Sequence, residues 1–87
     1  MKNEIKEVTK NLLSTNNIED LQKNKEDMLL IFEKNQSADN FFFGPLIQII
    51  SEDYSKLLEK LQNNQDTDIE NEKLRIVFIL SAVLNLL

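Results

Sequence analysis

Apolar residues recur at intervals of three and four positions along most of this 87-residue chain. This spacing places them on one face of an α-helix. The pattern predicts four helices, at about residues 2–13, 18–34, 45–62 and 68–87. The first three helices each have one apolar face, formed by Ile5, Val8 and Leu12, by Ile18, Leu21, Met28, Ile31 and Phe32, and by Leu46, Ile47, Ile50, Tyr54, Leu57, Leu58 and Leu61.

The last predicted helix differs because its apolar residues are not confined to one face. Eleven of the fourteen residues from Leu74 to Leu87 are apolar. A helix that is apolar on all sides is buried in a core or in lipid, and about 21 Å of helix is too short for a hydrocarbon layer of about 30 Å. We therefore expect a central core helix that packs against two neighbours. Its surplus apolar residues, Leu84, Leu86 and Leu87, are candidates for contact with a partner.

Polar residues mark where the helices begin. Asn16, with Glu19 three residues later, fits the N-cap of the second helix, and Asn17 with Asp20 is the alternative. Pro45 suits the first turn of the third helix, where its missing N–H would have no partner in any case. The third helix is therefore expected to begin near this proline.

The start of the fourth helix carries a capping box, the segment Thr67-Asp68-Ile69-Glu70. Its acidic residues, with Asp66 and Glu72 on either side, suit the positive end of a helix dipole. The links between the predicted helices are short, which favours antiparallel neighbours. We therefore predict one all-α domain, residues 1–87, folded as an antiparallel, up-down-up-down four-helix bundle.

Composition narrows the possible functions. A net charge of −5 argues against nucleic-acid binding, which needs a cationic surface. The chain has no cysteine and no histidine, so the commonest general base and the commonest transition-metal ligands are missing. A calcium loop that began at Asp66 would need glycine and glutamate where Asn71 and Val77 stand. We expect no enzymatic activity, no metal site and no cofactor.

Three polar side chains lie within or next to the apolar parts of the predicted helices. Tyr54 shares the apolar face of the third helix, and we expect its ring in the core and its hydroxyl at the rim. Lys73 and Arg75 flank the apolar run, and their long stems are expected to keep that end of the helix in water.

Three consecutive aromatic residues, Phe41, Phe42 and Phe43, precede the third helix. Not all three can point inward from one loop. In one interpretation, two of them close the open end of the bundle while Phe43 packs against the third helix. In the other, Phe41 and Phe42 form an exposed patch for a partner, because aromatic residues are favoured anchors at interfaces.

The order of these parts resembles a known family. The second helix ends in the segment Leu29–Lys34, and after a polar loop the segment Gly44–Ile47 opens the third helix with Gly-Pro-Leu-Ile. With the short first helix of mixed charge, this order resembles the immunity proteins that protect lactic-acid bacteria and their relatives from pediocin-like (class IIa) bacteriocins, the enterocin A immunity type. The architecture resembles the family throughout, and the sequence does so over about Leu29–Leu61. The acidic net charge is a departure, since family members tend to be basic.

The resemblance implies a non-enzymatic four-helix protein of the cytoplasm, acting at the inner face of the membrane without a transmembrane segment. Its implied partner is a sugar-uptake permease with a bound bacteriocin, recognised from the inside. Our alternative hypothesis is a small homo-oligomeric regulator or phage-derived adaptor, whose fourth helix packs against a second copy. Whether the protein is a monomer or a homodimer stays open. The candidate partner contacts are Phe41, Phe42, Leu84, Leu86 and Leu87.

Overall fold

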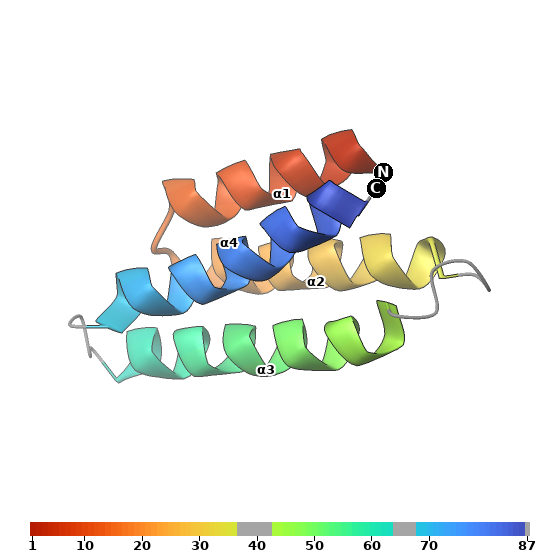
Figure 1. The fold of residues 1–87 in the computed structure, drawn as a ribbon. Coiled ribbons are helices and arrows are strands. Elements are labelled where there is room, and N and C mark those ends of the chain that lie inside the picture. The colour runs from red at the N-terminus through yellow and green to blue at the C-terminus, as the bar shows by residue number, and fades with distance from the viewer. Residues whose placement is uncertain (37–42, 64–67, 87) are drawn as a thin grey trace.

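Four α-helices form an antiparallel bundle in the computed structural model, which describes residues 1–36, 43–63 and 68–86. The helices are α1 (Lys2–Ser14), α2 (Ile18–Lys34), α3 (Phe43–Gln62) and α4 (Ile69–Leu86). Figure 1 shows successive helices running in opposite directions. Each helix packs against the next one along the chain, and α4 also packs against α1. The predicted all-α, up-down-up-down four-helix bundle is confirmed.

The core consists of the helix faces that the apolar spacing predicts. Short helices owe most of their stability to such packing, because isolated helices of this length are marginal in water. The buried apolar residues of the first three helices are Ile5, Val8, Leu12, Leu21, Met28, Ile31, Phe32, Phe43, Ile50, Tyr54, Leu57 and Leu58. Ile18, Leu46, Ile47 and Leu61 are partly buried against them.

The third helix begins at Phe43, two residues before the start expected near Pro45. Phe43 is fully buried, and its ring meets that of Phe32 on α2 edge-to-face, with the centroids 5.1 Å apart. This contact holds the first turn against α2. Pro45 still lies where a helix N–H has no intrahelical partner, so it does not interrupt the helix.

The link between α1 and α2 is held by side-chain hydrogen bonds. Asn17 is the N-cap of α2, and its Oδ1 accepts a hydrogen bond of 3.1 Å from the N–H of Asp20. Of the two predicted caps, the Asn17 and Asp20 pair is therefore the one that forms. The Thr15 hydroxyl accepts a hydrogen bond from the Asn17 N–H and donates one to the Asp20 carboxylate.

Tyr54 differs from the expectation, because its hydroxyl lies inside the bundle and not at the rim. The hydroxyl donates to Oδ1 of Asn24, a buried residue of α2. The Nδ2 of Asn24 donates to the Val8 carbonyl of α1 over 2.9 Å. Burying these polar groups is tolerated because each finds a partner. The apolar spacing of α2 did not indicate that Asn24 belongs to the core.

Helix α4 is only half covered, which corrects the expectation of a helix buried on most sides. It packs against α3 and α1 through Ile76, Leu80 and Val83. Its opposite side carries large apolar residues in contact with water. None of the helices described here is both long and apolar enough to cross a membrane.

Candidate functional site

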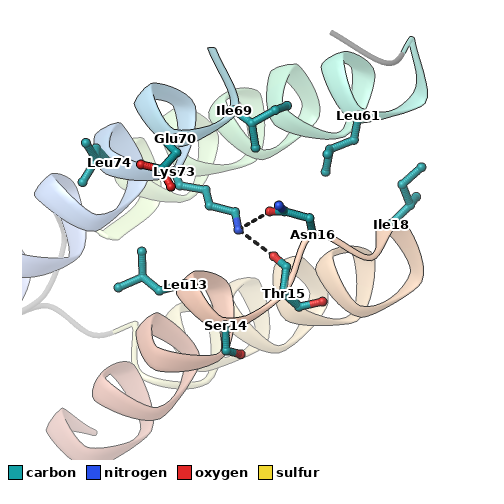
Figure 2. A pocket seen from close by; sticks show the side chains of 10 residues that line it. All are labelled: Leu13, Ser14, Thr15, Asn16, Ile18, Leu61, Ile69, Glu70, Lys73 and Leu74. Atoms are coloured by element: carbon teal, nitrogen blue, oxygen red, sulfur yellow. Dashed lines mark hydrogen bonds between the residues drawn. The ribbon is translucent and has the colours of Figure 1, made fainter. Parts of the chain in front are cut away.

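A pocket of about 650 Å³ lies at the end of the bundle where α1 leads into α2 and where α4 begins (Figure 2). This volume falls within the range of about 300–1,000 Å³ that is usual for small-molecule sites. Its apolar wall residues come from α1, α2, α3 and α4; they are Leu13, Ile18, Leu61, Ile69 and Leu74. Four separate helices therefore contribute to one pocket.

Lys73 crosses this pocket from α4 to the link between α1 and α2. In Figure 2 its side chain lies between Leu13 and Leu74 on one side and the remaining apolar residues on the other. Its Nζ donates to the Thr15 carbonyl over 2.6 Å and to the Asn16 Oδ1 over 2.5 Å. Lys73 is only 7% exposed, so the prediction that it stays in water is wrong.

The charge of Lys73 compensates the negative end of α1. Thr15 is the C-cap of that helix, and the last turn of α1 has no basic residue of its own. A cation near the C-terminal carbonyls of a helix is stabilising, and here it comes from α4. Burial lowers the pKa of Lys73, and the nearby carboxylate of Glu70 partly opposes this shift.

A second buried charge, the carboxylate of Glu72, lies between α3 and α4. Lys60 forms an ion pair of 2.9 Å with Oε1 of Glu72 and a longer one of 3.5 Å with Asp68. The hydrogen bond to Glu72 raises the pKa of Lys60, and desolvation partly opposes it. The other oxygen of Glu72, Oε2, is buried without a hydrogen-bond partner among the described residues. Glu72 therefore joins two helices, and it also lies in the first turn of α4, where an acidic residue was predicted to suit the helix dipole.

The solvent-facing side of α4 is the largest departure from a polar surface that we find on the described helices. Leu74, Phe78 and Leu86 are 56%, 76% and 70% exposed, and Ala82 between them is also exposed. These four residues recur at intervals of four and share one side of the helix. We call them the outer face of α4. A shallow groove lies beside it, with Asp53 of α3 among the residues that line it.

The five predicted partner contacts have different outcomes. Phe41, Phe42 and Leu87 lie outside the described residues. Leu84 is partly buried against the core. Leu86 is exposed and belongs to the outer face of α4. Arg75 is 62% exposed, close to this face, as expected for a residue that keeps its charge in water.

The prediction did not include Leu74 and Phe78, because a helix that is apolar on all sides gives no preferred face. Once Ile76, Leu80 and Val83 are taken as the inner side of α4, a four-residue spacing places Leu74 and Phe78 on the outside. Lys73 was harder to find, because the acceptors of its hydrogen bonds lie 57 and 58 residues away along the chain.

The fold and these features define a small all-α protein with one apolar helix face open to solvent and one pocket bridged by a buried lysine. Within the described ranges, no three carboxylate, histidine or cysteine side chains lie close enough together to hold a metal ion. Comparisons with protein-family models, with curated proteins and with solved structures find no match for this chain.

Proposed function

We propose that this protein is a non-enzymatic bacteriocin immunity protein that works by binding another protein. In this proposal it acts in the cytoplasm, at the inner face of the membrane. There it recognises a sugar-uptake permease with a bound pediocin-like bacteriocin and prevents the lethal pore. The observation that carries the proposal is the outer face of α4, combined with the order of helices that resembles the immunity family.

The outer face of α4 has the properties of a binding surface. Large exposed apolar residues in a row are unusual on a monomeric protein and mark sites of interaction. Phe78 lies near the middle of the row and is the most exposed of its large residues. Central aromatic side chains contribute a disproportionate share of binding free energy at interfaces. Phe78 is therefore the proposed anchor.

The experiment expresses the protein in a bacteriocin-sensitive strain and measures survival against a panel of pediocin-like peptides. We expect the wild-type chain to protect against at least one peptide. Phe78→Glu should lose protection by at least tenfold in inhibitory concentration, because a carboxylate cannot be buried in an apolar contact without a partner. Because Phe78 is largely exposed, we expect the Phe78→Glu variant to fold like the wild type.

The matched control is Leu30→Glu, which places the same charge at an exposed apolar position of α2. It should protect as well as the wild type. If no peptide of the panel is resisted, the immunity function is refuted. If Phe78→Glu protects fully, immunity stands but the outer face of α4 is not the surface that mediates it.

The alternative function uses the same face for a second copy of this chain. An antiparallel pairing about a two-fold axis brings Phe78 of each copy over Ala82 of the other and Leu74 over Leu86. Such a homodimer would be a helical regulator or adaptor. Light scattering at micromolar concentration distinguishes the two, because the immunity proposal predicts a mass of 10.2 kDa and the alternative predicts twice that mass.

A further inference from the structure

The buried ammonium group of Lys73 is not fully compensated by the bundle. Among the residues that the structure describes, its Nζ forms no ion pair with a carboxylate. Its two acceptors, a backbone carbonyl and an amide oxygen, are neutral. The C-terminal end of α1 supplies about half of an elementary negative charge. A singly charged anion that enters the pocket would favour the charged form of this lysine.

Lys73 and Asn16 each keep an N–H donor that takes no part in these hydrogen bonds. An ammonium group has three N–H donors, and Lys73 uses two of them. Because lysine can only donate, the amide of Asn16 must turn its oxygen toward Lys73, and its Nδ2 is then left as a second donor (Figure 2). A carboxylate has two acceptor oxygens, which match these two donors.

The residues that line the pocket indicate the charge of the ligand and the polarity of its remaining part. Leu61 and Ile69 lie on the same side of the lysine, and their side chains offer an apolar surface within the pocket. The carboxylate of Glu70 also lines the pocket and is exposed to solvent. Its charge opposes any anion in the pocket, and it opposes a doubly charged phosphate monoester more strongly than a singly charged carboxylate. A ligand with a single negative charge and a short apolar tail meets both conditions.

We propose that this pocket binds a monocarboxylate with a short alkyl tail, its carboxylate on Lys73 and Asn16 and its tail against Leu61 and Ile69. The pocket, of about 650 Å³, has room for a ligand of this size. It is separate from the outer face of α4 except for Leu74, which borders both. The inference rests on the pocket alone, and its outcome does not depend on the proposed function.

The test titrates the full-length protein with octanoate, with octanol and with inorganic phosphate. We follow the amide signals of Thr15 and Asn16 by NMR and the midpoint of thermal unfolding. Octanoate should shift these signals saturably, with a dissociation constant of about 1 mM for a ligand of this size, and should raise the midpoint. Octanol and phosphate should bind with dissociation constants at least tenfold higher. If octanol binds as well as octanoate, or if octanoate causes no saturable shift, the proposal is wrong.

Substitutions test whether Lys73 and Asn16 donate to the carboxylate of octanoate. Lys73→Met should weaken octanoate binding at least tenfold, whereas the control Lys56→Met, at an exposed position of α3, should leave it unchanged. If Lys73→Met does not fold, Asn16→Asp replaces it as the test, because it supplies a carboxylate to Lys73 from within the chain. This variant should fold and should no longer bind octanoate. Unchanged octanoate binding by Asn16→Asp would contradict the assignment.

Discussion

Asn24 and Tyr54 join three helices through buried hydrogen bonds, since Asn24 also reaches the backbone of α1. Burial raises the pKa of Tyr54 above its ordinary value of 10.0, so its hydroxyl remains a donor over the accessible pH range. The pair therefore fixes the relative position of α1, α2 and α3 in a way that apolar contacts alone do not.

Removing the Tyr54 hydroxyl tests the importance of this pair. Tyr54→Phe leaves Oδ1 of Asn24 buried without a partner, and we expect a loss of about 1–3 kcal/mol in the free energy of unfolding. Urea denaturation measures it. The double variant Asn24→Leu with Tyr54→Phe should recover part of this loss, because both polar groups are then absent. A single variant as stable as the wild type would show that the hydrogen bond contributes little.

Lys73 and Lys60 should affect stability in opposite directions as the pH rises. The pKa of Lys73 is lowered in the folded state, so the unfolded chain holds its proton longer and stability increases toward the ordinary pKa of 10.5. The pKa of Lys60 is raised, mainly by its hydrogen bond to Glu72, so its contribution is complete below 10.5 and is lost as the pH rises through the raised value.

Urea unfolding of the wild type, Lys73→Met and Lys60→Met across the alkaline range separates these contributions. Relative to Lys73→Met, the wild type should gain stability with increasing pH below 10.5. Relative to Lys60→Met, it should lose stability above 10.5. If both differences change in the same direction, at least one of the two lysines does not have the environment that we describe.

Each helix was predictable to within two residues at its described ends, because apolar spacing and capping residues act locally. Only α3 differs noticeably, since its start depends on the contact between Phe43 and Phe32, which are distant in the sequence. The orientation of α4 was not predictable in the same way. A helix with apolar residues on all sides gives no preferred face, so only the packing of α1 and α3 decides that Leu80 points inward and Phe78 outward.

Two leucines of α4 test this orientation. Leu80 is fully buried, and Leu80→Ala should lower the free energy of unfolding by about 2–5 kcal/mol through lost contacts and a cavity. Leu86→Ala is the matched control, because its side chain is mostly exposed, and the expected change is within about 0.5 kcal/mol. Equal effects of the two substitutions in urea denaturation would mean that α4 does not pack as described.

The described residues combine a closely packed apolar interior with an apolar side of α4 that is open to solvent. Its net charge of −5 favours solubility, yet α4 has no acidic residue after Glu72. An apolar side without acidic residues, on an otherwise acidic protein, is suited to contact with another protein. Composition alone led us to expect no nucleic-acid binding. The exposed apolar side of α4 could be identified only from the arrangement of the helices.

Photo-crosslinking in cells tests the role of this surface most directly. A photoreactive phenylalanine analogue replaces Phe78 in one strain and Leu30 in another, and each strain is irradiated with and without a pediocin-like bacteriocin. We predict a crosslink from position 78 to the sugar-uptake permease that appears only with the bacteriocin, and none from position 30. Full protection without any crosslink from position 78, or equal crosslinks from both positions, would contradict the account.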